Sequence, residues 1–136
     1  MTREVRIGAD PVAVWSVIAD PSMQERLDPR CRVDSALGDW RVAGSEFTIV
    51  VRRARLRYLV IQAEPGFRWL TRVEHNGKQV AVQRGELTTS EADTLLSWTV
   101  TVSVSRLQRW LWERSCKREM PRWLAAVERE TLARNE

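Results

Sequence analysis

The chain has 136 residues, 43% of them hydrophobic, which is enough for one domain that removes roughly two thirds of its unfolded surface from water. Its 22 Lys and Arg residues exceed its 18 acidic residues and give a formal net charge of +4, a mild excess that fits a solvated surface better than nucleic-acid binding. The lack of roughly 18 continuous apolar residues excludes a membrane span, and the first ten residues lack the apolar core of a signal peptide, so we predict a single cytoplasmic domain, residues 1–136.

Three Asp-Pro pairs fall within ADPVAVWSVIADPSMQERLDP, residues 9–29. An Asp at the N-cap accepts hydrogen bonds from unpaired backbone N–H groups, and Pro fits the first helical position because its missing N–H costs nothing there. Asp10 and Asp20 therefore each begin a helix, and Asp28, which precedes a further proline, ends the second one. The predicted elements are a strand over residues 2–7 and two short helices, over residues 10–19 and 22–27.

After these helices the spacing of apolar residues changes from helical to alternating. The segments are rich in Val, Ile, Thr and aromatic residues, as is typical of antiparallel strands. Asn76-Gly77 is a hairpin signal, and the polar stretch 88–93 predicts a longer loop. The six predicted strands cover residues 31–38, 45–51, 56–64, 67–74, 78–87 and 94–104.

A long helix is predicted over residues 105–134, because its apolar residues recur every three or four positions. Pro121 lies inside this helix and predicts a kink. Leu107, Trp110 and Leu111 lie off the main apolar stripe and predict a second face with a different partner. The main stripe consists of Trp112, Cys116, Met120, Trp123, Leu124 and Val127.

The order of these elements resembles the START-related superfamily (SRPBCC), which includes the birch pollen allergen, lipid-transfer START domains and bacterial polyketide cyclase/dehydrase-like proteins. The segments that carry the resemblance are REVRIGADPVAVWSVIADP, RLDP, GSEF, QAEPGFRW and LLSWTVTV. Leu27 departs from the pattern, since the family often has an aromatic residue there. The resemblance implies an α+β helix-grip fold, with a seven-stranded curved antiparallel sheet around a long C-terminal helix and a cavity between them.

Seven of the ten aromatic residues are Trp, a residue that suits both a packed core and a cavity wall. Alternation along each strand then decides which side chains point inward, although strand 78–87 gives no preferred face. A cavity of roughly 300–1,000 Å³ is usual for a small-molecule site, so we expect an apolar ligand, aromatic or polycyclic. The predicted ligand-binding residues are Trp15, Phe47, Ile49, Tyr58, Phe67, Trp69, Trp98, Val100, Trp112, Cys116, Met120 and Trp123.

The resemblance also allows an alternative, a polyketide cyclase/aromatase or dehydratase-type enzyme, which needs few catalytic residues. Tyr58 is the best single proton donor, and Gln62 on the same predicted face can orient a carbonyl. The only histidine, His75, falls in a turn. With Cys31 and Cys116 far apart in sequence as well, no metal site and no cofactor are predicted.

A third hypothesis comes from VRRARLRY, residues 51–58, which concentrates arginines in one hairpin. Arg53, Arg55 and Arg57 share one face by alternation and can grip a phosphate or carboxylate with their planar donor forks. The alternative is a solvated hairpin whose charges prevent edge pairing. An RNA- or protein-binding module ranks third because no nucleic-acid motif is present, and the oligomeric state stays open.

Overall fold

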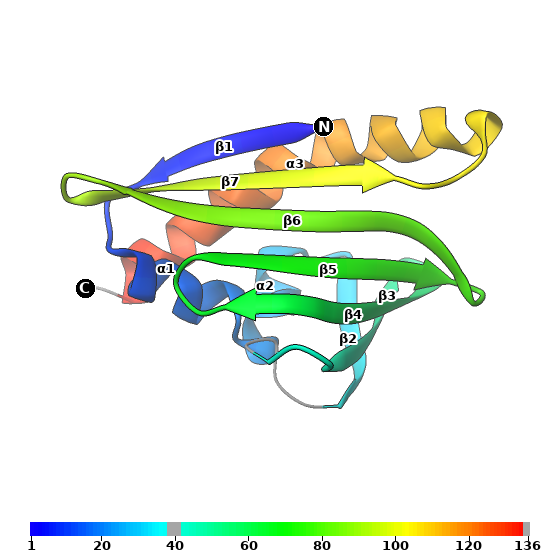
Figure 1. Ribbon diagram of the computed structural model, residues 1–136, viewed down its shortest axis with the longest axis horizontal. Helices are drawn as coiled ribbons and strands as arrows, with labels where there is room; N and C mark the ends of the chain where they lie inside the picture. Colours follow the sequence, from blue (N-terminus) through cyan, green and yellow to red (C-terminus); the bar gives the residue numbers. More distant parts are fainter. Residues whose placement is uncertain (38–41, 135–136) are drawn as a thin grey trace.

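The fold is one antiparallel sheet curved around a long C-terminal helix, and the computed structural model describes it for residues 1–37 and 42–134 (Figure 1). The seven strands have the order β1-β7-β6-β5-β4-β3-β2. This confirms the predicted architecture. The strands are β1 (Thr2–Ile7), β2 (Cys31–Leu37), β3 (Glu46–Val51), β4 (Ala54–Glu64), β5 (Arg68–His75), β6 (Lys78–Ser90) and β7 (Asp93–Val102), and the helices are α1 (Pro11–Ile18), η1 (Pro21–Met23), α2 (Gln24–Leu27) and α3 (Arg106–Arg134).

The Asp-Pro pairs act as the sequence predicts. The Asp10 carboxylate accepts a hydrogen bond of 2.9 Å from the backbone N of Ala13 at the start of α1. Asp20 accepts one of 2.9 Å from the backbone N of Ser22, so it begins η1. Backbone at Asp28 is extended and ends α2. The predicted second helix is thus a 3₁₀ turn followed by a single α-helical turn.

The predicted loop over residues 88–93 is wrong, because β6 and β7 continue almost to their connection. Thr88 and Thr89 pair with β7, and a two-residue turn separates Ser90 from Asp93. Glu91 in this turn has a φ of 55°. Threonine favours extended backbone, so the polar stretch extends the hairpin. The Asn76-Gly77 hairpin turn is confirmed, with positive φ at both residues.

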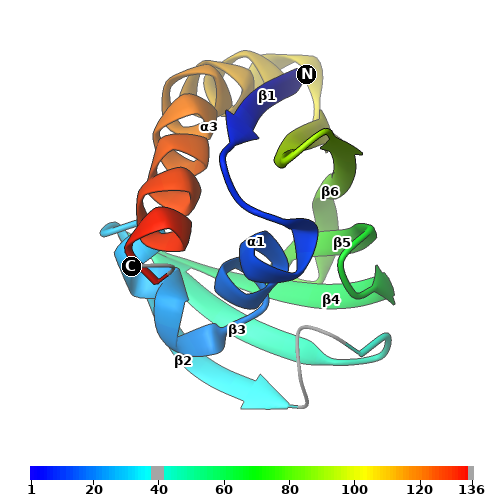
Figure 2. The ribbon, with the colours of Figure 1, turned by 90° about the vertical axis from the view of Figure 1, so that its left-hand side faces the viewer.

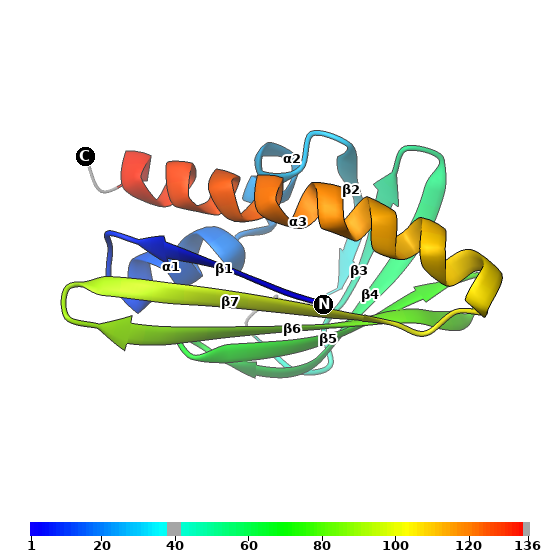
Figure 3. The ribbon, with the colours of Figure 1, turned by 90° about the horizontal axis from the view of Figure 1, so that it is seen from above.

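Helix α3 lies across the concave side of the sheet, beside α1 (Figures 2 and 3). Met120, Leu124 and Val127 are buried along its inner stripe. The helix continues through Pro121, which is exposed. None of the described helices is both long and apolar enough to cross a membrane.

Candidate functional site

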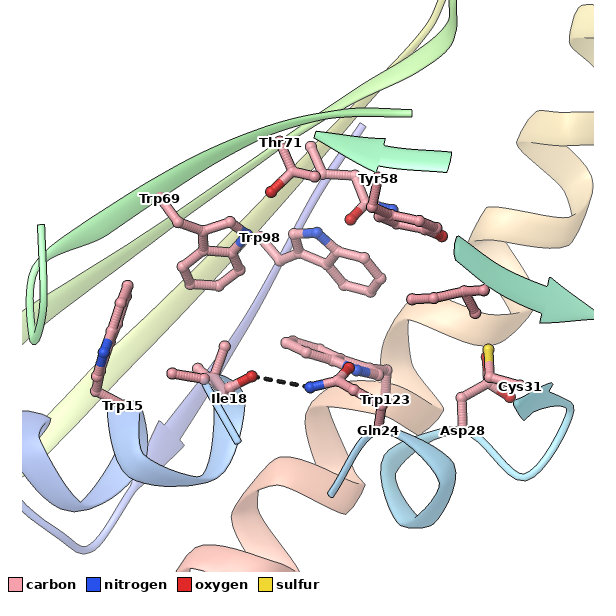
Figure 4. A pocket seen from close by; sticks show the side chains of 13 residues that line it. Trp15, Ile18, Gln24, Asp28, Cys31, Tyr58, Trp69, Thr71, Trp98 and Trp123 are labelled. Atoms are coloured by element: carbon pink, nitrogen blue, oxygen red, sulfur yellow. Dashed lines mark hydrogen bonds between the residues drawn. The ribbon is translucent and has the colours of Figure 1, made fainter. Parts of the chain in front are cut away.

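A cavity of about 100 Å³ lies between the concave face of the sheet, the short helices and α3 (Figure 4). This inner pocket is smaller than the range expected from the sequence, because four indole rings occupy much of the space between sheet and helix. The residues that line it are Trp15, Ile18, Ala19, Gln24, Asp28, Cys31, Ile49, Tyr58, Trp69, Thr71, Gln83, Trp98 and Trp123.

The four indoles come from four different elements: Trp15 from α1, Trp69 from β5, Trp98 from β7 and Trp123 from α3. Ring centroids are 6.2 Å apart for Trp15 and Trp69, 6.4 Å for Trp69 and Trp123, and 4.5 Å for Trp98 and Trp123. Such spacings are those of interacting aromatic pairs. The rings therefore pack against one another and also border the pocket.

Gly85 on β6 provides the space that Trp69 occupies. The strand register places Gly85 between Trp69 on β5 and Trp98 on β7. A Cβ atom at this position would lie 1.9 Å from Cη2 of Trp69, far inside van der Waals contact. A glycine within a strand marks such a close approach, so Gly85 is the sequence signal for the position of the Trp69 ring.

Polar groups at one end of the pocket are held in defined protonation states. Burial raises the pKa of Tyr58, and Gln83 hydrogen-bonds to its hydroxyl. Burial also raises the pKa of the Cys31 thiol to about 12. Burial opposes ionisation of Asp28, but hydrogen bonds from Arg30 outweigh it and lower the pKa of the carboxyl. Tyr58 and Cys31 thus stay neutral at physiological pH, while Asp28 is a carboxylate.

The Asp28 carboxylate is largely occupied. Arg30 binds it through two nitrogens, Nε at 3.0 Å and Nη2 at 2.7 Å, and the Cys31 thiol donates to it as well. Gln24 also has a structural contact, since its Nε2 donates to the backbone oxygen of Ile18 at 2.9 Å. Neither Gln24 nor Asp28 was predicted to line a pocket, because the sequence pattern identifies them only as residues of a short helix and its end.

Two residues that line the pocket carry a hydrogen-bond donor with no partner among the described residues. Nε1 of Trp15 and Nε1 of Trp98 are buried, and neither donates to any group in the described part of the chain. Trp15 as a whole is only 6% exposed. A buried donor without an acceptor costs about 1–3 kcal/mol. The residues of the pocket wall thus include two buried N–H donors that no group in the described part of the chain satisfies.

The structure brings half of the predicted ligand-binding residues together. Those on the pocket wall are Trp15, Ile49, Tyr58, Trp69, Trp98 and Trp123. Phe47, Val100 and Met120 are buried in the core without lining the pocket. Trp112 and Cys116 are half-buried beside Met120, about three and two helical turns from Trp123, the pocket residue of α3. The inward direction of these side chains is as predicted, but the pocket covers only part of the concave face.

Phe67 is the clear error in this set, because its side chain is 65% exposed. The predicted strand began at residue 67, whereas β5 begins at Arg68. Phe67 instead lies in the preceding turn, where its backbone N donates to the backbone oxygen of Glu64 at 2.9 Å. Alternation does not apply outside the strand, so the Phe67 ring points to solvent and not inward as predicted.

Gln62 is also wrongly placed by alternation. An irregularity in the pairing of β4 with β5, between Val60 and Gln62, shifts the register by one residue. Gln62 is consequently exposed, and its Nε2 donates to Glu64 at 3.1 Å. The inward face passes to Ala63, which lies opposite Trp69. Gln62 therefore cannot orient a molecule in the pocket.

Two further polar residues of the wall, Thr71 and Gln83, were also not predicted. Thr71 lies between Trp69 and Val73 on the inward face of β5, so alternation along this strand is enough to predict that its side chain points inward. Gln83 lies on β6, for which alternation predicts no preferred face. Its neighbours across the sheet, Thr71 and Val100, both point inward, and it is this pairing that decides its direction.

The arginine hairpin lies away from the pocket. Arg55 Nη1 lies 2.6 Å from Oδ2 of Asp34, and Arg57 Nη1 lies 3.0 Å from Oε1 of Glu74. Arg53 is exposed in the β3–β4 turn itself, so the alternation that grouped it with Arg55 and Arg57 does not apply to it. Acidic side chains on the same face thus occupy donors that an external anion would need. In the described part of the chain, no three His, Cys, Asp or Glu side chains are grouped as a metal site would require.

Comparison with known proteins reveals a similarity of fold. No family model matches the chain, and no curated protein matches its sequence. Protein MLL2253 from Mesorhizobium loti has a TM-score of 0.75 at 19% identity, covering 100% of this chain and 99% of its own. For Ara h 8.0201 the TM-score is 0.70 at 11% identity, with coverage of 98% and 97%. DynU16, a protein in the dynemicin biosynthetic locus, has a TM-score of 0.71 at 15% identity, covering 94% of this chain and 46% of its own.

These likenesses confirm the predicted helix-grip fold. It is the fold implied by the resemblance to the START-related superfamily.

Proposed function

We propose that this chain binds a small aromatic molecule of about one ring, bearing a hydrogen-bond acceptor, in the inner pocket. The observation that carries the proposal is the buried Nε1 of Trp98, a donor with no partner among the described residues on the wall of a hollow. The fold shared with DynU16, a protein from a biosynthetic locus, agrees with a role in small-molecule chemistry.

The volume of the pocket limits the size of the ligand. An engineered apolar cavity of about 150 Å³ in another protein admits benzene, and the inner pocket has about 100 Å³. A single ring therefore fits with small adjustments of the wall. A polycyclic skeleton, the larger of the two ligand types expected from the sequence, requires the indoles to move apart.

The acceptor requirement gives the site selectivity among ring compounds. A benzene ring would fill the apolar space but leave the Trp98 N–H unpaired. A ring that carries an oxygen would accept this hydrogen bond, whose loss is worth about 1–3 kcal/mol. We therefore expect oxygen-bearing rings to bind more tightly than bare hydrocarbons of the same size.

The protonation states of the pocket favour binding over catalysis. A general acid or base works best when its pKa lies near the ambient pH. Burial raises the pKa of Tyr58 and moves that of Cys31 to about 12, while Arg30 binds the Asp28 carboxylate through two nitrogens. No titratable group on the described wall is thus tuned for proton transfer, and no observation favours the cyclase or dehydratase hypothesis.

Titration with benzene and with phenol tests the proposal, with tryptophan fluorescence and calorimetry as measurements. We expect saturable binding of both, with phenol about tenfold tighter, since 1.4 kcal/mol corresponds to a factor of ten. The Ala19→Leu variant fills the pocket and should abolish binding. Ala125→Leu, an equal change at an exposed position of α3, should leave binding intact. The absence of saturable binding by either compound would contradict the proposal.

A further inference from the structure

A second hollow, of about 370 Å³, lies between α2 and α3 and adjoins the inner pocket. Asp28 and Trp123 belong to the walls of both. Four arginines border this hollow, which we call the arginine groove: Arg26, Arg30, Arg122 and Arg129. The two hollows are therefore neighbours, and the one beyond Trp123 is lined by basic side chains.

One of the four arginines is already neutralised. Arg30 lies 2.7 Å from the Asp28 carboxylate and 3.5 Å from that of Glu119, and its side chain is only 25% exposed. This pairing has a second consequence, because it cancels the negative charge of Asp28 at the junction of the two hollows. The carboxylate at the junction is therefore paired with a guanidinium and is not an isolated negative charge.

The other three arginines have weaker contacts. Arg26 lies 3.8 Å and Arg129 lies 3.9 Å from Glu130, and Arg122 lies 3.6 Å from Glu119. These distances exceed the 2.7–3.2 Å of an N–H···O hydrogen bond. Their side chains are 70%, 65% and 69% exposed, and none of them donates a hydrogen bond to another described residue. Their donor forks are available to an external group.

The charge balance of the groove is positive. Its lining contains four arginines and two acids, Asp28 and Glu119. Glu130, beside Arg26 and Arg129, adds one negative charge, and Arg118, 3.0 Å from Glu119, adds one positive charge. The groove therefore retains a positive excess when the neighbouring groups are included.

We propose that the ligand carries an oxyanion, a carboxylate or a phosphate, that Arg26, Arg122 and Arg129 bind in the arginine groove while its ring occupies the inner pocket. Planar guanidinium forks match both oxyanions. The proposal rests on the proposed function and narrows it to amphipathic acids. It also differs from the sequence hypothesis, which assigned anion binding to Arg53, Arg55 and Arg57.

Three compounds with the same phenylalkyl body test this inference: 3-phenylpropionate, 2-phenylethyl phosphate and the neutral 3-phenylpropan-1-ol. Calorimetry at low and high salt would compare the wild type with an Arg122→Gln, Arg129→Gln double variant. Arg109→Gln, an exposed arginine of α3 outside the groove, is the matched control. Circular dichroism would establish that the variants are folded.

We expect the wild type to bind at least one of the two anions about tenfold more tightly than the alcohol. Added salt should reduce this ratio, because exposed charges are screened. The double variant should bind the anions no more tightly than the alcohol, and its affinity for the alcohol should be unchanged. Arg109→Gln should keep the wild-type preference for the anion and the wild-type affinity for the alcohol. The ratio of the affinities for the two anions shows whether the groove prefers a carboxylate or a phosphate.

Two results would overturn the inference and leave the proposed function standing. One is equal affinity of the wild type for anions and alcohol, and the other is an anion preference that persists in the double variant or disappears equally in Arg109→Gln. Failure of all three compounds, together with benzene and phenol, to bind the wild type would instead contradict the proposed function itself.

Discussion

The two faces of the curved sheet differ in whether their polar groups have partners within the protein. On the outer face, Glu74 is a carboxylate that receives hydrogen bonds from Arg57 and Arg72. On the inner face, burial keeps the Cys31 thiol neutral, and the N–H of Trp98 has no acceptor in the described part of the chain. The outer face satisfies its charges within the protein, whereas the inner face retains unpaired hydrogen-bonding capacity.

This contrast separates two meanings of a polar cluster. Ion pairs such as Arg57–Glu74 are complete without any other molecule, so they indicate structure and not binding. A buried donor without an acceptor carries a free-energy cost that folding alone does not recover. The inner pocket is thus the better candidate for function, although the arginine hairpin is the more conspicuous feature of the sequence.

The largest expected effect concerns the chemical reactivity of Cys31. Burial raises the pKa of its thiol from 9.0 to about 12, and only the thiolate reacts with alkylating reagents. At pH 8 we expect iodoacetamide to modify this residue about a thousandfold more slowly in the native protein than in denaturant. A Cys116→Ser variant isolates the signal, and mass spectrometry measures it. Similar native and denatured rates would show that the inner face does not suppress ionisation.

Gly85→Ala should disrupt the inner face most among single substitutions. The new Cβ would lie 1.9 Å from the Trp69 ring, so the indole must leave its position over β6. Overpacking of this kind costs about 1–3 kcal/mol, and we expect the upper part of this range in a urea denaturation experiment. Arg84→Ala, at an exposed position of the same strand, is the control. An unchanged midpoint for Gly85→Ala would mean that the Trp69 wall is loosely packed.

Glu74→Gln tests the outer face and should have a smaller effect. Hydrogen bonds from Arg72, the largest cause, and from Arg57 lower the pKa of Glu74. A lowered native pKa contributes stability at neutral pH, and this contribution is lost as the pH falls through the usual Glu range of about 4.3 and below. We expect the variant to melt earlier than the wild type at pH 7. The two melting temperatures should converge as the pH is lowered toward 3, and a constant difference would contradict the charge-based account.

Much of the fold could be predicted because its signals are local. Asp10 and Asp20 cap their helices through side-chain hydrogen bonds that depend on only a few neighbouring residues. Alternation likewise placed Trp69 and Trp98 on the inner face, since both lie well inside regular strands. Prediction succeeded wherever the cause of the structure lies within a few residues along the chain.

The site could be predicted only in part, because several of its determinants are not local. The irregular pairing after Val60 reverses the direction of Gln62, and no residue type in that strand announces it. Gln83 depends on its neighbours across the sheet. The volume of the pocket depends on how the four indoles pack, which composition does not specify. The arginine groove joins α2 to α3, segments about 90 residues apart in the sequence.

The smallest expected effect on stability is also the most informative, and it comes from Trp98→Phe. This change replaces an indole with the smaller benzene ring, and the lost packing destabilises the protein. It also removes a buried donor that has no partner among the described residues. The two contributions have opposite signs, so we expect a net change within about 1 kcal/mol. Trp69→Phe removes a similar volume from the same wall, and Trp69 has no such unpaired donor; we expect it to cost about 1–2 kcal/mol.

Added phenol should sharpen this difference. It should raise the melting temperature of the wild type more than that of Trp98→Phe, because a ligand stabilises the native state according to its affinity. An equal cost for the two substitutions, or an equal gain from phenol, would place the Trp98 N–H among ordinary core groups. A small cost combined with a lost response to phenol would instead mean that this donor is kept for the ligand at the expense of stability.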